Sequence, residues 1–313
     1  MVTPLTGQRI LVTGVTGQIA FPMASFLAAP ELDNEVFGLA RFGGEGDRSR
    51  VEAAGIVPVV ADLGGGDLSA VPADVDYVLH LATFQAGGLD YDHALRVNAE
   101  GTGLLLHHCR SAKGVLVTST ASVYEPNPDR WHVFAETDPL GDTHAPHSPT
   151  YSISKITEEA VARTMCRVLD LPVTIARINA SYGPNGGLPA IHLGQIARGE
   201  TVVLRAPGPT PYSPIHQHDL NAQAGPLLSA ASVPATIVNW GGDEVVTAED
   251  WCAYLGEVAG RQPTIEKVVF PGAVTGSVMS TDRRMAITGP CTVPWKDGMR
   301  RMAEARLKGT NSA

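Results

Sequence analysis

Short apolar runs alternate with longer amphipathic stretches through the first two-thirds of the chain. Six apolar runs have about the length of a strand, at residues 9–14, 35–41, 56–62, 75–82, 114–120 and 171–178. The stretches between them predict helices at 18–29, 48–54, 91–112 and 151–169. Repeated strand and helix units are typical of a parallel sheet that is buried on both faces. The pattern therefore predicts an α/β fold with a doubly wound parallel sheet of the Rossmann type.

The regular alternation ends near residue 178. Residues 183–217 are rich in Gly and Pro, and the remainder mixes short helices with one clear strand at 235–240. We predict a dinucleotide-binding domain over residues 1–178, to whose sheet 235–240 returns. Residues 179–313 are predicted to form a smaller, irregular region that mainly binds substrate. A second irregular segment, 125–150, is a candidate lid, because loops of this length in compact domains are usually functional or disordered.

Composition narrows the class of protein. The chain has 313 residues, of which 44% are hydrophobic and 18% charged, so it can bury a substantial core. Its net charge of −9 argues against a nucleic-acid partner, which is bound largely through Lys and Arg. No stretch approaches the roughly 18 consecutive apolar residues that cross a bilayer, and no signal-peptide pattern is present. With four scattered cysteines, typical of reduced thiols, we predict a cytoplasmic protein with a small-molecule substrate and no membrane partner.

The first predicted strand is followed directly by a glycine-rich turn, TGVTGQIA at residues 13–20, and then by a helix. Gly14 permits a tight turn, and Gly17 lets the backbone approach a pyrophosphate beside Gln18 and Ile19. The start of the helix presents free N–H groups and a positive dipole end to such an anion. A purely structural turn is the alternative, but the position between the first strand and the first helix favours a dinucleotide site.

The end of the second predicted strand bears on which dinucleotide is bound. A carboxylate there would accept the ribose 2′-OH of NAD, whereas an Arg would accommodate the 2′-phosphate of NADP. The strand ends in Arg41 with no acid, which favours NADP(H) and leaves NAD(H) as the alternative. Arg48 or Arg50 could also take the phosphate charge. Asp62, at the end of the third strand, is placed to meet the adenine amino group, although Asp is also a common turn former.

Candidate catalytic chemistry lies at the start of the helix predicted at 151–169, which follows the start signal SPT at 148–150. Tyr151 and Lys155 are four residues apart and hence on one face of that helix. An adjacent ammonium and a positively charged nicotinamide both favour phenolate, as proton transfer with a carbinol oxygen requires. Thr120 closes the fifth strand at the sheet edge where open α/β folds bind ligands.

With these residues the chain resembles the extended short-chain dehydrogenase/reductase family, also called the NAD-dependent epimerase/dehydratase family. The matching motifs are spread over most of the chain: TGxxGxxA at 13–20, Asp62-Leu63, His80-Leu81-Ala82, Val97-Asn98 with Gly101-Thr102, the segment 120–124, YxxxK at 151–155, Tyr182-Gly183-Pro184, Ile215-His216 with Asp219, and Asn239 with Gly241-Gly242. Together they are specific for the family and much less specific for the substrate.

The resemblance implies roles for individual residues. Tyr151 would be the acid/base, Lys155 would lower its pKa and bind the nicotinamide ribose, and Thr120 would hydrogen-bond the reacting oxygen. Further residues expected at the cofactor are Leu63, Leu81, Ala82, Thr83 and Asn98, and those expected at the substrate, besides Thr120, are Phe84, Asn179 and Tyr212. The resemblance also implies a homodimer through the helices predicted at 91–112 and 151–169.

Three departures from the family pattern narrow the range of substrates that the chain is expected to bind. Ala121 and Ser122 stand where the family's 4,6-dehydratases carry an Asp-Glu pair, so sugar dehydration is disfavoured. Ala180 stands where nucleotide-sugar members usually carry Asn, and Tyr212 where an Arg commonly clamps a pyrophosphate. Both changes weaken the nucleotide-sugar interpretation, although Arg205 could substitute from the same loop.

We therefore predict an NAD(P)-dependent oxidoreductase or epimerase that transfers hydride between nicotinamide and a secondary alcohol or ketone carbon. Its substrate would be sugar-like or another small carbonyl compound. The alternatives are a nucleotide-sugar 4-epimerase with tightly bound NAD and a non-catalytic dinucleotide sensor. No metal is predicted, because the histidine pairs His107-His108 and His216/His218 lack a third ligand at matching spacing. Three other histidines could line the substrate pocket: His144, His147 and His192.

Overall fold

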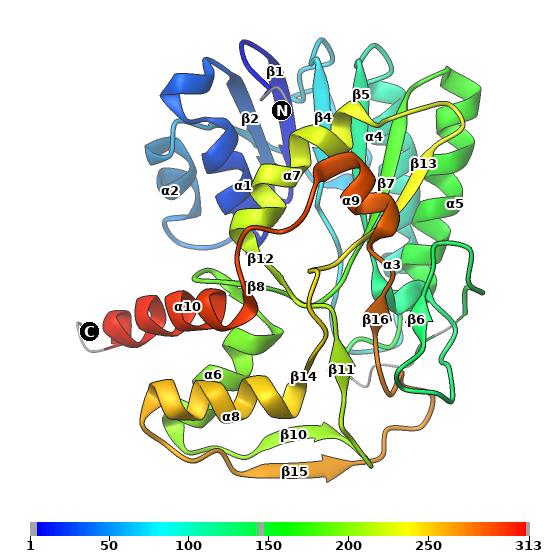
Figure 1. The fold of residues 1–313 in the computed structure, drawn as a ribbon. Coiled ribbons are helices and arrows are strands. Elements are labelled where there is room, and N and C mark those ends of the chain that lie inside the picture. Colours follow the sequence, from blue (N-terminus) through cyan, green and yellow to red (C-terminus); the bar gives the residue numbers. More distant parts are fainter. Residues whose placement is uncertain (1–4, 142, 144–146, 311–313) are drawn as a thin grey trace.

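The fold, taken from a computed structural model that describes residues 5–141, 143 and 147–310, is built on a seven-stranded sheet (Figure 1). All seven strands are parallel. In spatial order they are β3 (Val57–Val60), β2 (Glu35–Ala40), β1 (Arg9–Thr13), β4 (Tyr77–His80), β5 (Gly114–Thr120), β7 (Val173–Ile178) and β13 (Thr236–Trp240). The strand order reverses between β1 and β4, so a crevice opens there at the carboxyl ends of the strands. The predicted doubly wound α/β fold is confirmed.

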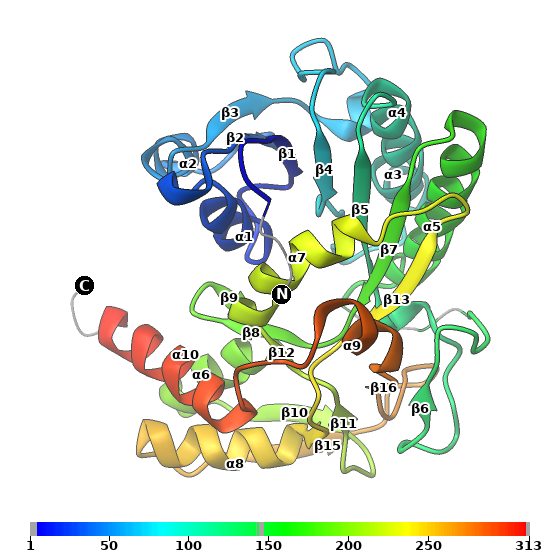
Figure 2. The ribbon, with the colours of Figure 1, turned by 45° about the horizontal axis from the view of Figure 1, so that its top comes forward.

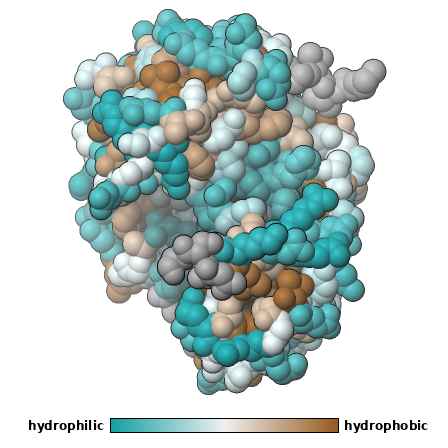
Figure 3. All heavy atoms as spheres, turned by 90° about the vertical axis from the view of Figure 1, so that its left-hand side faces the viewer, coloured by the Kyte–Doolittle hydropathy of each residue, from teal (hydrophilic) through white to brown (hydrophobic). Residues whose placement is uncertain are grey.

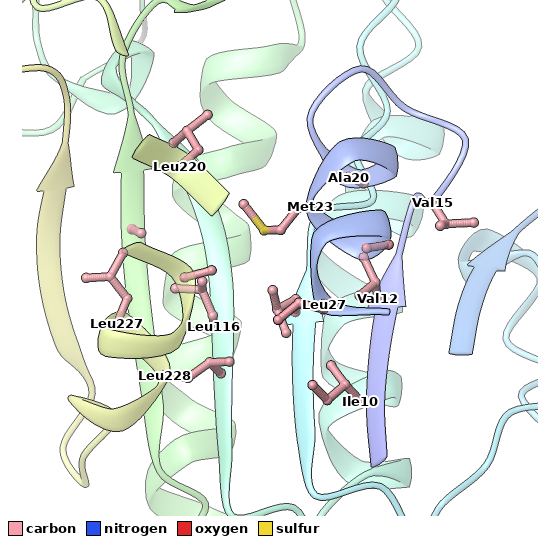
Figure 4. Close-up of a cluster of buried hydrophobic side chains, with 14 of the residues drawn as sticks. Ile10, Val12, Val15, Ala20, Met23, Leu27, Leu116, Leu220, Leu227 and Leu228 are labelled. Atoms are coloured by element: carbon pink, nitrogen blue, oxygen red, sulfur yellow. The ribbon is translucent and has the colours of Figure 1, made fainter. Parts of the chain in front are cut away.

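Helices cover both faces of this sheet. Successive side chains along each strand point to opposite faces, and both sets are mainly apolar. On β1, Ile10 and Val12 pack into one hydrophobic cluster while Leu11 packs into the other. One face carries α1 (Ala20–Leu27), α2 (Asp47–Ala53) and α7 (Gln217–Ser229). Figure 4 shows apolar side chains of α1 and α7 against β1 and β5 on this face. The opposite face carries α4 (Gly101–His108) and α5 (Tyr151–Leu169).

The helix predicted at 91–112 differs from the structure. The chain there forms α3 (Tyr91–Leu95), a π-helical turn η3 (Arg96–Glu100) and then α4. Asn98 within the turn is turned inward, where its side chain accepts from the Phe84 N–H and donates to the Phe84 carbonyl and to Ser154. Single π turns inside α-helices are frequent at functional sites, and periodicity alone does not reveal them.

A smaller lobe lies beyond the carboxyl ends of the sheet (Figures 1 and 2). It contains α6 (Leu188–Arg198), α8 (Ala248–Ala259), α10 (Trp295–Thr310) and the parallel pair β10 (Val202–Arg205) and β15 (Ile265–Val268). These elements share a hydrophobic cluster centred on Trp251 and Leu193, separate from those of the sheet. The main sheet also draws on residues beyond 178, because β13 pairs with β7 and the leucines of α7 pack on the sheet.

Short elements connect the two parts. Three-residue 3₁₀ turns occur at η1 (Pro30–Leu32), η2 (Leu63–Gly65) and η4 (Ala121–Val123). The remaining short elements are β8 (Ser181–Gly183), β9 (Gly186–Gly187) and β12 (Ile215–His216) in one sheet, β11 (Pro211–Tyr212) with β14 (Val246–Thr247), β6 (Val133–Phe134) with β16 (Val278–Met279), and α9 (Asp282–Thr288). The pairing of β6 with β16 ties the candidate lid segment to the C-terminal half; whether the segment closes over a ligand stays a prediction.

The face seen in Figure 3, on the side of α2 and α10, is mostly hydrophilic, with smaller hydrophobic areas. Among the described residues, no helix is both long and apolar enough to cross a membrane.

Candidate active site

A cleft of about 1030 Å³ runs between the carboxyl edge of the sheet and the smaller lobe. Its walls come from the glycine-rich turn, the ends of β4, β5 and β7, the start of α5, and the lobe elements α6, β10 and β11. Because the crevice of an open α/β sheet lies at this edge, the cleft is the expected ligand site.

Gly14 is held where only glycine fits. Its φ is +69°, and an added Cβ would lie 2.8 Å from the Cα of Ala82 at the end of β4. The turn is closed by a hydrogen bond from the Gly17 N–H to the Gly14 carbonyl, 2.8 Å long. Thr13 fixes the neighbouring strand by accepting from the Leu81 and Ala82 N–H groups. The tight turn thus brings the start of α1 against the end of β4 and leaves room for a ligand backbone.

The start of α1 fits a pyrophosphate. Neither a side-chain cap nor an acidic residue occupies its first turn, so the positive end of the helix dipole faces the cleft uncompensated. Gln18 lines the cleft and accepts from the Gly187 N–H at 2.9 Å, which joins the turn to β9. These features fit the dinucleotide that the sequence predicts, with Gly14, Gly17, Gln18 and Ile19 all lining the cleft.

Three arginines lie near the end of β2, and they differ in their partners. Arg48 pairs with Glu52, and Arg50 donates to the Thr16 carbonyl and lies over the Phe21 ring. Arg41 is exposed and has no hydrogen bond or ion pair within the described parts of the chain. Arg41 is therefore the arginine whose charge is available at the strand end.

Thr120 and Tyr151 both line the cleft, and their side chains hydrogen-bond each other. Thr120 ends β5, where its hydroxyl accepts from the Ser122 N–H, and Tyr151 begins α5. The Thr150 side chain does not cap this helix, so the predicted start signal places the boundary correctly without a side-chain hydrogen bond. Burial raises the pKa of Tyr151, while Lys155 and a hydrogen bond with Thr120 lower it. The phenol is thus protonated unless positive charge gathers beside it.

Lys155 lies one helical turn further on and is 1% exposed. Its ammonium donates to the Thr118 carbonyl at 2.8 Å and forms an ion pair with Glu158. An ammonium has three N–H donors. One donor therefore remains for a ligand in the cleft, which Lys155 lines.

A second buried ion pair lies behind the first. Glu159 accepts from Arg177 with both oxygens, at 2.9 and 2.7 Å, and from Ser119. Arg177 also donates to the hydroxyl of Tyr124. This network fixes α5 against β5 and β7, and so holds the backbone from which Tyr151 and Lys155 project.

The substrate half of the cleft mixes apolar and polar side chains and carries no acid among the described residues. Asn179 donates to the Ser277 carbonyl and accepts from the Ser213 N–H, so its amide is engaged within the protein. Tyr212 packs on Trp251 with ring centroids 5.1 Å apart. Arg205 donates to the Val274 carbonyl and has no ion pair with any described residue. Among the described residues that line the cleft, none is Asp or Glu, although the chain has a net charge of −9.

The predicted site residues divide into two groups. Those that line the cleft are Gly14, Gly17, Gln18, Ile19, Leu81, Thr83, Thr120, Tyr151, Lys155, Asn179 and Tyr212, and His147 and His192 join them. The others lie nearby: Arg41 is exposed, Asp62 accepts from the Gly64 N–H, Leu63 is buried in the core, Ala82 adjoins Gly14, Asn98 is buried under Phe84, and Phe84 packs on His93. Their ligand contacts stay predictions. His144 lies outside the described residues.

Glu158 and Glu159 are the site residues that the sequence analysis missed. Both follow Lys155 at helical spacing, so the pattern YxxxKxxEE carries a recognisable signal: two acids on the same face of the helix as Tyr151 and Lys155. In the described parts of the chain, no group of three or more His, Cys, Asp or Glu side chains is arranged to hold a metal ion.

Comparison with known proteins agrees with this geometry. The model of the NAD dependent epimerase/dehydratase family matches residues 10–215. No curated protein sequence matches the chain.

Solved structures with the same fold cover nearly the whole chain. A UDP-glucuronic acid 4-epimerase from Bacillus cereus, in complex with UDP-glucuronic acid and NAD, is 19% identical with a TM-score of 0.81, covering 96% of this chain and 99% of that one. A dTDP-glucose 4,6-dehydratase from Bacillus anthracis, in complex with NAD, is 20% identical with a TM-score of 0.82, covering 97% and 98%. A UDP-glucose 4-epimerase from Thermus thermophilus, in complex with NAD, is 24% identical with a TM-score of 0.78, covering 96% and 99%.

Proposed function

The chain belongs to the NAD dependent epimerase/dehydratase family, and from that premise we propose that it is an NAD(P)-dependent oxidoreductase or epimerase acting on a secondary alcohol or ketone carbon. The observation that carries this proposal is the meeting of Thr120, Tyr151 and Lys155 in one cleft with the glycine-rich turn. A sensor without chemistry would not need a Tyr paired with a buried Lys at that place.

Each side chain has a task in the proposed reaction. A bound nicotinamide supplies or accepts the hydride. Tyr151 gives a proton to the substrate oxygen during reduction and removes it during oxidation. Thr120 hydrogen-bonds the same oxygen, and Lys155 stabilises the phenolate while its remaining N–H binds the ribose. Thr120 and Lys155 are buried and Tyr151 is partly buried, which limits water around the reacting groups and strengthens these electrostatic effects.

The cofactor class follows from the family, and NADP(H) in preference to NAD(H) is our finer proposal. Arg41 supports it, because its guanidinium at the end of β2 lacks any partner in the described chain and no acid takes its place. The similar structures were solved with NAD, so NAD(H) is the cofactor against which this preference is measured.

The substrate half of the cleft supports a neutral or anionic polar substrate. Arg205 offers a positive charge without an ion pair to any described residue, and Tyr212 supplies a hydroxyl in the same cleft. A sugar-like or other small carbonyl compound fits these groups. A nucleotide-sugar 4-epimerase is the second candidate, favoured by similar structures in complex with UDP sugars, such as UDP-glucuronic acid and UDP-glucose.

We also propose that the enzyme is a cytoplasmic homodimer. The four cysteines are free, and three of them are buried, which suits a reducing compartment. α4 and α5 both expose apolar side chains, at Leu104 and Val168, where partner helices could pack.

The test is to purify the protein and identify any retained nucleotide by mass spectrometry, then to measure the Kd of NADPH and NADH for the emptied protein. Tightly held NAD supports an epimerase and contradicts the NADP preference. An empty site that binds NADPH at least tenfold more tightly than NADH supports a reductase. Failure to bind either nucleotide would overturn the proposed function.

A further inference from the structure

Glu158 is a buried carboxylate directly beside the catalytic pair, and its role is not explained by packing. It is 0% exposed, and its closest contact with an opposite charge is the Lys155 ammonium, one helical turn away. Apart from this contact with Lys155, neither of its oxygens has a hydrogen-bond partner among the described residues. Burying a carboxylate under these conditions costs stability, so a purely structural position would be served better by an apolar side chain.

The protons around Glu158 can be assigned from the hydrogen bonds. Thr102 donates its hydroxyl proton to the Asn98 carbonyl at 2.6 Å, so it accepts from Nε2 of His80 at 2.7 Å. Thr13 accepts two backbone N–H groups and donates to His80 Nδ1 at 2.8 Å. His80 is therefore neutral, in keeping with burial and Lys155, which lower its pKa to about 3. The Nε2–H of His80 is donated to Thr102, and the Nε2 atom lies 3.7 Å from Oε1 of Glu158.

Lys155 and Glu159 are the charged groups that act on Glu158. Burial raises the pKa of Glu158 to about 7, Lys155 lowers it, and Glu159 raises it. Glu159 is itself neutralised by Arg177 on β7. The other titratable groups on helices packed against α5 are exposed or only partly buried: Tyr91, Asp92, His93, Arg96, Glu100, His107 and His108. Above neutral pH, the charge of Lys155 is thus offset by one carboxylate.

We propose that Glu158 is a positioning residue of the reaction: its carboxylate fixes the Lys155 ammonium and offsets its charge, and thereby sets how readily Tyr151 gives up its proton. The Thr118 carbonyl and Glu158 together hold Lys155 in one direction, which leaves a single donor for the cleft. In the same arrangement Glu158 opposes the action of Lys155 on the phenol, because it raises the pKa of Tyr151 where Lys155 lowers it.

The effect on Tyr151 can be estimated from the helix. Seven residues at 1.5 Å each separate Glu158 from Tyr151 by about 10 Å. A unit charge at that distance, at an effective permittivity of about 20, shifts a titration by about one pH unit. Removal of the carboxylate charge should therefore let Tyr151 ionise at a pH about one unit lower.

The experiment follows the ionisation of Tyr151 by tyrosinate ultraviolet absorbance in the protein saturated with its oxidised nucleotide. Subtracting the same titration of Tyr151→Phe, made in each background, isolates this one phenol. In Glu158→Gln the midpoint should fall by about one pH unit. Glu158→Met, of similar length and without charge, gives the same reading if the Gln variant folds poorly. Circular dichroism shows that each variant is folded.

Two controls separate charge from structure. Glu158→Asp keeps the carboxylate and should titrate within about 0.3 pH unit of the wild type. Glu257→Gln removes an exposed carboxylate of α8 and should do the same. An unchanged or higher midpoint in the Gln and Met variants would overturn the proposal. Although the proposal rests on the proposed function, this titration needs no substrate, so its failure is distinct from an absence of turnover.

Discussion

At the scale of single residues, the charged side chains of the site are of two kinds: buried charges that form ion pairs and arginines that do not. Lys155, Glu158, Glu159 and Arg177 are almost fully buried and paired with one another, whereas Arg41 and Arg205 keep their charges without an ion pair in the described structure. Buried ion pairs hold Tyr151 and Lys155 in place, and the two arginines without an ion pair are available for ligands. The behaviour of each group under substitution should follow this division.

Arg41→Asp should reverse the cofactor preference. A charge-assisted contact with a 2′-phosphate contributes about 1.5–3 kcal/mol, so NADP(H) affinity should fall about 10- to 150-fold while NAD(H) affinity is kept. Isothermal titration calorimetry with both nucleotides measures the ratio. Arg48→Ala, on α2 and paired with Glu52, is the control and should leave the ratio unchanged. An unaltered ratio in Arg41→Asp would exclude this arginine as the determinant.

The free energy of unfolding of the protein should also depend on pH through Glu158. Its pKa is raised by burial to about 7 from an ordinary value of 4.5, so the folded state holds this proton more tightly than the unfolded state. The resulting stabilisation is complete below about pH 4.5 and is lost as pH rises to about 7, on the order of 3 kcal/mol. Urea unfolding of wild type and Glu158→Gln over this range should show a difference with that slope. A pH-independent difference between the two proteins would contradict it.

At the scale of elements, the turn between β1 and α1 depends on close approach as well as on backbone conformation. Gly14→Ala should reduce nucleotide affinity at least tenfold, because its Cβ would lie 2.8 Å from the Ala82 Cα and push β4 away from the turn. Gly7→Ala is a matched control: its φ is +63°, and nothing lies within 4 Å of an added Cβ. Gly7→Ala should cost about 1 kcal/mol of stability and leave binding intact. Fluorescence titration with NADPH compares them, and equal binding by both variants would refute the close-approach argument.

Elements with a strong period could be predicted from the sequence, and those shaped by tertiary contacts could not. β5 and α5 have the predicted bounds, because an uninterrupted apolar run and a clear helical period specify them. The π turn at Arg96–Glu100 was missed, since it depends on Asn98 binding the backbone of a distant segment. The Tyr and Lys pair was recognisable from spacing. The hydrogen bonds of the Asn179 side chain with Ser213 and Ser277 join segments far apart in the sequence, so they could not be predicted from the sequence.

At the scale of the whole molecule, an acidic protein presents a cleft whose described lining has no acid. In the proposed function the parallel sheet would supply the cofactor side and the smaller lobe the substrate side, and a hydrogen bond between Gly187 and Gln18 joins the two parts. The net charge that disfavours nucleic acid is therefore compatible with local binding of an anionic dinucleotide. The proposed dimer would form through α4 and α5, on the face of the sheet opposite to α1, α2 and α7.

The proposed dimer can be tested on its exposed apolar residues. Leu104 of α4 is 49% exposed and Val168 of α5 is 72% exposed. A double substitution, Leu104→Glu with Val168→Glu, should convert a dimer to a monomer, because charges would be buried at the interface. Sedimentation velocity measures the mass. Val60→Glu, at an equally exposed site on the edge strand β3, should leave the mass unchanged. A wild-type monomer would refute the proposed dimer directly.

The most direct test of the central claim is the rate of hydride transfer in Tyr151→Phe. With reduced or oxidised nucleotide and a panel of sugar and ketone substrates, nicotinamide absorbance reports turnover in wild type and variant. Removal of the proton-transferring hydroxyl should lower kcat about 10²- to 10⁴-fold, while the Kd for the nucleotide stays within about threefold. Turnover by Tyr151→Phe within threefold of the wild type would contradict the account, because Tyr151 would then not be the group that moves the proton.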